Sequence, residues 1–439
     1  MRIRDALKSL HWVPVLDPDK KLPLLAKPPL ISVIVPAHNE QSTIRQCLKS
    51  VLTQDYPRFE LILVDDRSED LTASIAKSLP GKQENFRIIS IGSLPPGWTG
   101  KCHALDVGVR HASGEWLAFL DADSRLHKSA LRLCYYEAVR RNANMVTLSP
   151  KFILKTFWEK ALQPAFAAMS CILYPLGLVN DPASPVASAN GMFYMISRSA
   201  YEKIGGHKEV RDLAVEDIGI GKRIKAAGLG LLFANGKNVL QTRMYTGFKA
   251  TVRGWTRILS ASMNYEMPTV LKYLGVHILM SFPVMAASLY FYISAAREIW
   301  PAAWFLLPLV CAIEMCVVSS WFCTQMGLPK KYSTLLILGN LLLVWVYLVI
   351  VKRILWKDAL QWRGTTYQAS RYEPTTLDPV ASEAFSASSS GPVLGEASWG
   401  KETSLYPRFR DSCGFEAAPH SQESPEALIQ STRLMAKNR

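Results

Sequence analysis

The sequence predicts a domain of the α/β class, followed by membrane-spanning helices and a polar tail. Between residues 30 and 150, short β-branched runs alternate with segments whose apolar residues recur at helical spacing. This alternation is typical of a mostly parallel sheet with helices on both faces. From about residue 273 the chain instead holds three long apolar stretches, and after residue 367 it is rich in Ser, Ala, Pro and Glu.

Strands and helices are expected in strict alternation before residue 150. The first strand, 31–35, is a β-branched run that Pro36 ends, and the helix 41–53 carries apolar residues on one face. The elements that follow are strand 60–64, helix 71–79, strand 86–91, helix 101–112, strand 116–120, helix 127–141 and strand 145–148. In such sheets ligands bind beyond the carboxyl ends of the strands, so side chains that follow strands are the first candidates for a site.

Beyond residue 150 the pattern is less regular. Residues 161–179 are apolar almost throughout but contain Pro164, Pro175 and Gly177. This composition fits a membrane-surface helix, a buried helix or a broken span, and we favour the surface helix. Residues 190–234 return to the composition of a globular domain.

The C-terminal apolar stretches are long enough to cross a bilayer. Each holds about 20 mainly apolar residues, which span a hydrocarbon core of ~30 Å. They are Tyr273–Ser294, Ala303–Phe322 and Tyr332–Val351. Three full spans would place Lys352 and Arg353 on the side opposite the domain, against the positive-inside tendency. One stretch is therefore a candidate for a re-entrant or interfacial segment, and Glu314 makes the middle one the first choice.

These features divide the chain into four expected parts. A polar lead-in, 1–29, precedes an α/β domain at 30–260. A transmembrane region of about three helices follows at 268–356. The remainder, 368–439, is expected to be disordered and to take no part in the chemistry.

Composition limits the classes of function. The chain has 439 residues, a formal charge of +14 and 49% apolar residues, which fits a protein lying against an anionic membrane surface. It has no zinc-ligand spacing and no basic run interleaved with aromatic residues, so nucleic-acid binding is not expected. The eight cysteines are scattered without a disulfide framework, which suits a reducing compartment. No continuous apolar segment follows the basic N-terminus, so a cleaved secretory signal is not expected.

Three pairs of acidic residues stand out in the sequence. The pairs are Asp65-Asp66, Asp121 with Asp123, and Glu216-Asp217. Two carboxylates at the tip of a strand are the hard oxygen ligands that Mg²⁺ or Mn²⁺ prefers. The Asp-x-Asp pattern alone is common in turns, but two of the three pairs end expected strands. Together they predict a single active site at one edge of the sheet.

Five motifs in order resemble the family 2 glycosyltransferases of GT-A fold, over about residues 30–260. They are Ile31–Glu40 (ISVIVPAHNE), Val64–Ser68 (VDDRS), Gly100-Lys101, Asp121–Asp123 (DAD) and Glu216-Asp217. Three further stretches are similar to the bacterial branch associated with hopanoid and carotenoid glycosylation, which also has C-terminal membrane helices. These are Leu94–Lys101 (LPPGWTGK), Arg243–Tyr245 with Gly254-Trp255, and Trp362–Tyr367 (WRGTTY).

The resemblance implies a nucleotide-sugar site. The residues that would bind the donor are Pro36, Asn39, Glu40, Asp65, Asp66, Lys101 and Asp121. Within that set, Asp66 would accept a hydrogen bond from a uracil N–H, and Lys101 would lie near the diphosphate. Taken alone, these motifs also fit a capped helix start, a turn and a solvated lysine.

The resemblance also implies the metal and the catalytic groups. Asp123, with Asp121, would hold Mg²⁺ or Mn²⁺, and Asp217 would be the general base. Glu216 would orient the loop or contact the acceptor. Processive and sphingolipid-acting members of the family carry a Gln/Arg-x-x-Arg-Trp motif, and here Gly254 stands where Arg is expected. The candidates for contact with acceptor or diphosphate are Arg243, Arg253 and Trp255, and packing at the membrane surface explains Trp255 equally well.

The expected function is that of a metal-dependent, inverting glycosyltransferase in the cytoplasmic membrane, multi-pass, with its catalytic domain in the cytoplasm. It would move a sugar from a nucleotide-sugar, favoured as a UDP-sugar, to a hydroxyl or carboxyl group of a lipid acceptor at the bilayer. Two alternatives are a processive polysaccharide synthase and a non-catalytic membrane scaffold with a degenerate domain. The sequence names neither the sugar nor the lipid.

Overall fold

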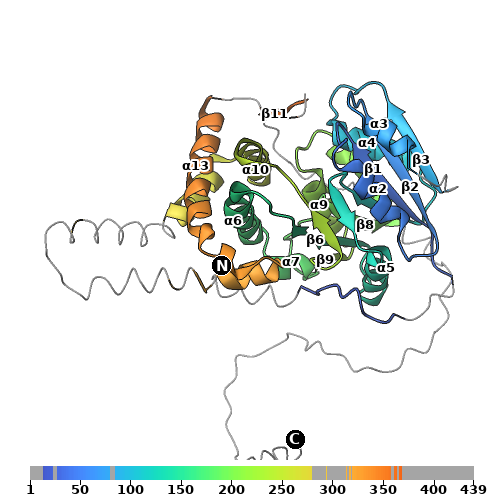
Figure 1. The fold of residues 1–439 in the computed structure, drawn as a ribbon, viewed down its shortest axis with the longest axis horizontal. Helices are drawn as coiled ribbons and strands as arrows, with labels where there is room; N and C mark the ends of the chain where they lie inside the picture. Colours follow the sequence, from blue (N-terminus) through green and yellow to red (C-terminus); the bar gives the residue numbers. More distant parts are fainter. Residues whose placement is uncertain are drawn as a thin grey trace, which may run out of the picture. The chain divides into compact units, whose positions relative to one another are not determined.

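The computed structural model describes residues 13–22, 27–79, 85–278, 319–356, 360–362 and 365–367, with positions 293, 313, 316 and 317. Its centre is a seven-stranded sheet in the order β3-β2-β1-β4-β8-β6-β9 (Figure 1). The strands are β1 (Ile31–Ala37), β2 (Phe59–Asp66), β3 (Phe86–Ile91), β4 (Trp116–Leu120), β6 (Met145–Ser149), β8 (Phe193–Ser197) and β9 (Leu231–Asn235). All neighbours are parallel except the two that pair with β8. The expected α/β class and mostly parallel sheet are confirmed.

Helices cover both faces of this sheet. They are α2 (Ile44–Leu52), α3 (Thr72–Lys77), α4 (Gly100–Arg110), α5 (Ala130–Arg140), α8 (Arg198–Lys203) and α9 (Glu216–Ala226), with a 3₁₀ turn, η1 (Gly206–Val210). Side chains of α2 and α5 share one hydrophobic core with Val33 and Val35. Side chains of α4, α8 and α9 share the other core with Ile34. Successive residues of β1 therefore point to opposite faces, and both faces are buried, which explains its uninterrupted apolar sequence.

A small second sheet lies beside the main one. It has the order β5-β10-β7 and consists of β5 (Ser124–Leu126), β7 (Lys151–Phe152) and β10 (Leu240–Thr242). Because β5 pairs with β10, Thr242 lies opposite Ser124, directly after the Asp-x-Asp segment. The Asp-x-Asp segment therefore lies between two paired strands, β4 and β5, which fix its two ends.

Part of the expected lead-in packs against the domain. Val15 forms a parallel bridge with Asn235 of β9, and Leu16 is buried. The Leu16 N–H donates to the Asn235 carbonyl (3.0 Å), and the Asn235 N–H donates to the Pro14 carbonyl (2.8 Å). The described residues around position 15 therefore extend the edge of the sheet.

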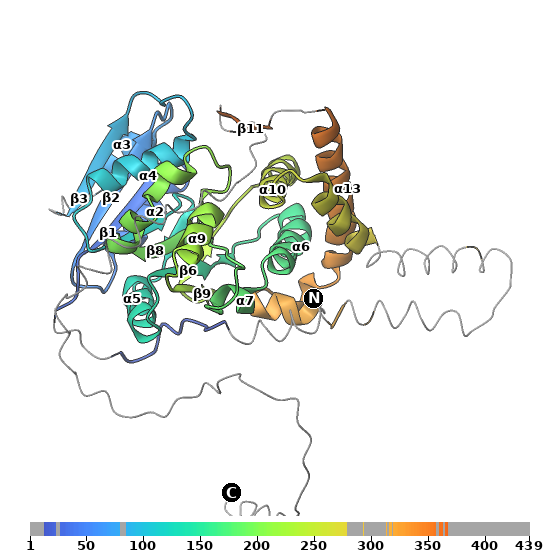
Figure 2. The same cartoon turned by 180° about the vertical axis from the view of Figure 1, so that it is seen from behind.

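Three helices form a separate layer with its own core. They are α6 (Phe157–Leu173), α10 (Phe248–Ser262) and α13 (Leu335–Trp356), side by side in both views (Figures 1 and 2). A capping box between Thr156 and Glu159 starts α6. Its middle, including Leu162, Phe166 and Met169, is buried. Of the three interpretations of residues 161–179, the structure agrees with the buried helix and not with the favoured membrane-surface helix. Helix α6 ends before Pro175, and the short α7 (Leu176–Asn180) follows.

The C-terminal region is described only in part. Among the described residues one helix, Leu338–Trp356 within α13, is long and apolar enough to cross a membrane by length and composition. It follows the 3₁₀ turn η2 (Lys330–Tyr332) and corresponds to the expected stretch 332–351. Most of the stretches 273–294 and 303–322, and the whole of 368–439, lie outside the described residues. Two short strands, β11 (Leu360–Trp362) and β12 (Thr365–Tyr367), pair antiparallel.

Candidate active site

A cavity of about 310 Å³ lies beyond the carboxyl ends of β1, β2 and β4. One part of its wall is polar and comes from loops after these strands and from the starts of α4 and α9. The polar wall includes Pro36, His38, Glu40, Asp66, Arg67, Lys101, Asp121, Asp123, Glu216 and Asp217. Of the six acidic residues expected at one edge of the sheet, all except Asp65 line this cavity.

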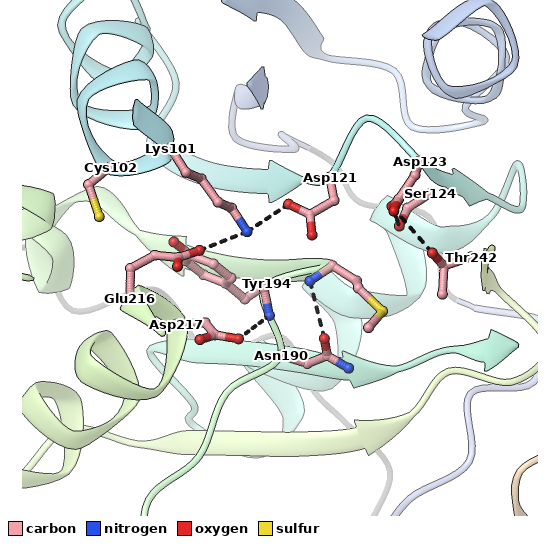
Figure 3. Close-up of polar contacts among 12 residues, drawn as sticks. Lys101, Cys102, Asp121, Asp123, Ser124, Asn190, Tyr194, Glu216, Asp217 and Thr242 are labelled. Carbon is pink, nitrogen blue, oxygen red and sulfur yellow. Dashed lines mark hydrogen bonds and ion pairs between the residues drawn. The ribbon is translucent and has the colours of Figure 1, made fainter. Parts of the chain in front are cut away.

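Lys101 is the centre of the polar wall. Its Nζ lies 2.7 Å from Asp121 Oδ1 and 2.7 Å from Glu216 Oε1, so one ammonium joins the loop after β4 to the start of α9 (Figure 3). Burial would lower the pKa of Lys101, but the negative charges of Asp121, Glu216 and Asp217 raise it well above its ordinary value. Lys101 is therefore a fixed positive charge within a group of carboxylates.

Asp217 lies beside this ion pair but has different surroundings. The Gly191 N–H donates to its Oδ2 at 2.5 Å, and the Ile218 N–H donates to its Oδ1 at 2.9 Å. Burial and the adjacent charge of Glu216 raise the pKa of Asp217 to about 7. For Glu216, burial also acts to raise the pKa, but Lys101 outweighs it and the pKa is lowered. The two neighbouring carboxylates are thus divided into an ion-paired group and a group suited to accept a proton near neutral pH.

Gly191 leaves room for this arrangement. A Cβ atom at this position would lie 2.9 Å from Lys101 Nζ and 3.0 Å from Asp217 Oδ2. Gly191 precedes the antiparallel strand β8, where the Asp121 N–H donates to the Met192 carbonyl at 3.1 Å. Sequence analysis missed Gly191, because the loop before β8 joins the site only through the pairing of β8 with β4.

Asp121 and Asp123 are suited to share a divalent cation with a bound diphosphate. Both side chains line the cavity, and Asp123 Oδ1 accepts hydrogen bonds from Thr242 Oγ1 and Ser124 Oγ, each at 3.3 Å. The described residues contain no group of three or more His, Cys, Asp or Glu side chains arranged to hold a metal. Protein-bound Mg²⁺ is commonly held by one or two carboxylates together with substrate phosphates, so two carboxylates fit this kind of site.

Several of the expected base-binding residues lie in the loops after β1 and β2, which hydrogen bonds join. The Asn39 N–H donates to Ser68 Oγ (3.0 Å), and Asn39 Oδ1 accepts from the Glu69 N–H (2.9 Å). Asn39 and Arg67 both have φ of 56°, which is the left-handed conformation. Among residues other than glycine, Asn adopts it more readily than most. Asp66 lines the cavity and pairs with the Arg67 guanidinium at 2.8 Å, a partner that sequence analysis did not foresee.

Two members of that set do not line the cavity. Asn39 instead holds the loops together, and Asp65 is buried at the end of β2. The Asp65 Oδ1 atom has no hydrogen-bond partner in the part of the chain that the structure describes. Asp65 is thus buried behind the wall of the cavity and Asn39 is exposed outside it, while Pro36, Glu40 and Asp66 form the wall.

The candidates on α10 and before it need correction. Trp255 lines the cavity, but its indole N–H donates to Gln163 Oε1 (2.9 Å) and its ring stacks on Phe166. Arg253 is exposed and does not line the cavity, because it lies on the outer face of α10. Arg243 also lies outside the wall and pairs with buried Glu159 at 3.0 Å.

Arg257, one helical turn after Arg253, lines the cavity instead. It donates from Nη1 to the Ala214 carbonyl at 2.6 Å, and its charge helps to lower the pKa of Glu216. No local sequence pattern distinguishes Arg257 from Arg253, because the placement of α10 against the cavity depends on tertiary packing.

Another part of the cavity wall is mainly apolar. Its lining residues come from α6, α10, β7 and the segments that contain Met192, Met244 and Met326. They include Phe152, Ala167, Cys171, Tyr174, Met192, Met244, Tyr245, Ile258 and Met326. Methionine side chains adapt to irregular apolar ligands, and concave apolar walls with a few polar groups are typical of small-molecule sites. Asp217 therefore lies in a cavity that is acidic on one side and apolar on the other.

Comparison with known proteins agrees with this architecture. Residues 32–205 match the family described as glycosyl transferase family 2. The resemblance to glycosyltransferase family 2 is confirmed for this part of the chain. The 4,4'-diaponeurosporenoate glycosyltransferase of Staphylococcus haemolyticus (strain JCSC1435) is 28% identical over 244 residues, 55% of this chain and 64% of that protein. The protein of the same name from Staphylococcus aureus (strain USA300) is 27% identical over 245 residues, with the same coverage.

The match to these family 2 relatives thus spans 64% of their length. A solved mannosyltransferase, PcManGT from Pyrobaculum calidifontis, in complex with GDP-Man and Mn²⁺, shares the fold with a TM-score of 0.50 and 18% identity. The similarity covers 81% of this chain and 95% of that one. The GT-A type of α/β domain expected from the motifs is therefore confirmed.

Proposed function

We propose that the protein is a metal-dependent, inverting glycosyltransferase that moves a sugar from a nucleotide-sugar, favoured as a UDP-sugar, to a lipid acceptor at the membrane. The observation that carries this proposal is the single cavity in which an acidic wall and an apolar wall meet beside Asp217. A nucleotide-sugar suits the acidic wall with a divalent cation, and a lipid suits the apolar wall.

The donor would bind along the ends of β1, β2 and β4. Asp66 would accept a hydrogen bond from the base, as it now does from Arg67. Asp123 and Asp121 would hold Mg²⁺ or Mn²⁺, which would offset the charge that develops on the diphosphate leaving group. The complex of the structural neighbour PcManGT with GDP-Man and Mn²⁺ supports this choice of donor class and cation.

Asp217 would take the proton of the acceptor. Its raised pKa, about 7, lets it accept a proton near neutral pH while still being ionised in a useful fraction of molecules. Glu216 is held in an ion pair by Lys101, so it is unsuited to attack the sugar as a second nucleophile. One base without a free nucleophilic carboxylate supports a single displacement with inversion.

The acceptor would enter along the apolar wall. The named activity of the relatives, glycosylation of 4,4'-diaponeurosporenoate, supports an elongated apolar acceptor that carries a hydroxyl or carboxyl group. We infer a location in the cytoplasmic membrane, multi-pass, with the catalytic domain in the cytoplasm. The three long apolar stretches of the sequence support this location, since two of them suffice for a multi-pass arrangement.

A processive polysaccharide synthase is the alternative enzyme. The departure at Gly254 and the outward position of Arg253 weigh against it, because neither supplies the Arg-Trp motif of processive relatives. A non-catalytic scaffold is opposed by the retention of Asp66, Asp121, Asp123 and Asp217 in one cavity.

The test uses membranes that contain the full chain, incubated with a panel of radiolabelled nucleotide-sugars, Mn²⁺ and a bacterial lipid extract. We expect label in the organic phase from one donor, as a lipid bearing a single sugar, and no label with EDTA. A ladder of long products would support the synthase instead. Failure of all donors, with no nucleotide binding, would favour the scaffold.

A further inference from the structure

Aromatic rings form a continuous row across the three helices of the second layer. Phe157 and Trp158 of α6 lie 5.2 Å apart, Trp158 lies 4.8 Å from Phe248 of α10, and Phe248 stacks at 6.1 Å on Trp345 of α13. Although these large rings contact one another, Phe157, Trp158 and Trp345 are 51%, 37% and 44% exposed. In this aromatic row (Phe157, Trp158, Phe248 and Trp345), Phe157, Trp158 and Trp345 form an exposed surface, and the half-buried Phe248 joins them to the core.

The outer face of α13 extends this surface. Leu341, Leu348, Leu355 and Trp356 are exposed, and with Trp345 they recur at helical spacing. The opposite face, which includes Val346 and Ile350, is buried in the core shared with α6 and α10. α13 is therefore apolar on both faces: one face packs on the domain and the other is uncovered.

The charges around this surface have one sign. The exposed ionisable residues of α6, α10, η2 and α13 are basic: Lys249, Arg253, Lys330, Lys331 and Lys352. These four elements expose no Asp or Glu, since Glu159 is buried and paired with Arg243. An exposed aromatic row with a basic border matches the interface of an anionic bilayer, where Trp rings and Lys or Arg side chains accumulate.

The row also limits the orientation of α13. Trp345 lies at the middle of this 22-residue helix, so in a spanning helix it would lie near the middle of the bilayer. Phe248 stacks on Trp345, and it would bring the exposed Lys249 to the same depth. Exposed charge at that depth is strongly unfavourable. If α13 instead lies in the plane of the interface, Lys249 stays among the headgroups, and only the exposed apolar face of α13 enters the membrane.

We propose that α13 lies in the plane of an anionic membrane surface, with the aromatic row in the headgroup region, and that both of its ends stay on the side of the catalytic domain. This orientation removes the conflict with the positive-inside tendency, because Lys352 and Arg353 remain with the domain. It also brings α6 and α10, which supply the apolar wall of the cavity, next to the bilayer. The inference concerns membrane geometry and does not depend on the proposed catalytic activity.

Cysteine labelling in the full chain tests this orientation. Lys331→Cys and Lys352→Cys mark exposed positions before and near the end of α13, and Lys208→Cys marks the exposed surface of the catalytic domain in η1. Each variant is treated with a membrane-impermeant maleimide in inside-out and in right-side-out vesicles. The unsubstituted chain gives the background of its own cysteines, and melting temperature confirms that each variant is folded.

We expect all three positions to react in the same vesicle orientation, at rates within a few-fold of one another. Reaction of Lys331→Cys and Lys352→Cys in opposite orientations would overturn the proposal, since α13 would then cross the membrane. Labelling at either position only after the membrane is disrupted would overturn it too. So would recovery of the full chain in the soluble fraction.

Discussion

At the scale of single residues, the site depends on how three carboxylates share one ammonium. Lys101 binds Asp121 and Glu216 directly, and this leaves Asp217 with backbone N–H donors. Burial and the charge of Glu216 then raise the pKa of Asp217. The same carboxyl group in water would be a much weaker base, so the surroundings give Asp217 the basicity that its proposed role requires.

Asp217→Asn should lower the rate of sugar transfer by ~10²–10⁴-fold, because general-base catalysis typically contributes that much. Nucleotide and Mn²⁺ should still bind. In the unsubstituted protein the base acts only when ionised, so the rate should fall as pH decreases through about 7. Initial rates between pH 5 and 9 measure this decrease. Full activity of Asp217→Asn at pH 8 would show that Asp217 is not the base.

Gly191→Ala tests the space beside the ion pairs. The added methyl group would contact Lys101 Nζ at 2.9 Å and Asp217 Oδ2 at 3.0 Å, both at the ends of side chains that can shift. The fold should therefore survive, while a displacement near 1 Å at the base should cost on the order of 10²-fold in turnover.

The control for this change is Gly92→Ala, where no atom lies within 4 Å of the new methyl group. Turnover numbers and melting temperatures of both variants give the comparison. Equal turnover of the two alanine variants would mean that the positions of Lys101 and Asp217 are not critical.

At the scale of elements, α13 approaches α6 closely at one glycine. A Cβ at Gly339 would contact the carbonyl oxygen of Ala161, and it would lie 2.8 Å from the Ala165 Cβ. These are atoms of a packed helix and cannot move aside cheaply. Gly339→Leu should therefore separate α13 from α6 and lower the melting temperature by several degrees, about 1–3 kcal/mol of overpacking.

Gly275→Ala is the matched control, since Gly275 is also helical but has nothing within 4 Å of the added atom. It should be neutral or slightly stabilising, because Ala favours helix over Gly. Melting curves in the same detergent compare the two. A Gly339→Leu protein as stable as Gly275→Ala would contradict the close packing of α13 on α6.

Most of the sheet could be predicted from the sequence, but its order could not. Strands such as β1 are continuous β-branched runs because both faces are buried, and the helices between them show apolar spacing. β8 is short and lies antiparallel between β4 and β6, a position that depends on long-range pairing. The helix 157–173 looked like a surface helix, since its covering partner α13 is more than 150 residues away in the chain.

The site residues also divide into those that local sequence predicts and those that tertiary packing places. Asp66, Asp121 and Asp123 follow strands, so local sequence places them at the edge of the sheet. Gly191 and Arg257 reach the cavity from segments whose position depends on tertiary packing, and no local pattern marks them. The ion pair of Lys101 with Glu216 likewise joins positions more than 100 residues apart.

At the scale of the whole molecule, the domain combines a polar wall, an apolar wall and a layer of three helices around one cavity. Helices α6 and α10 belong to two of these parts, since they line the cavity and carry the aromatic row. In the proposed orientation, a lipid acceptor would reach Asp217 without leaving the interface. This arrangement supplies effective concentration, which a catalytic domain free in solution would lack.

Calorimetric titration of the purified full chain with nucleoside diphosphates tests the central claim most directly. We predict that UDP binds in the presence of Mn²⁺, that removal of the metal weakens binding at least tenfold, about 1.4 kcal/mol, and that Asp123→Asn has the same effect. No binding of UDP, GDP, ADP or CDP with Mn²⁺ present would contradict a metal-dependent nucleotide-sugar site.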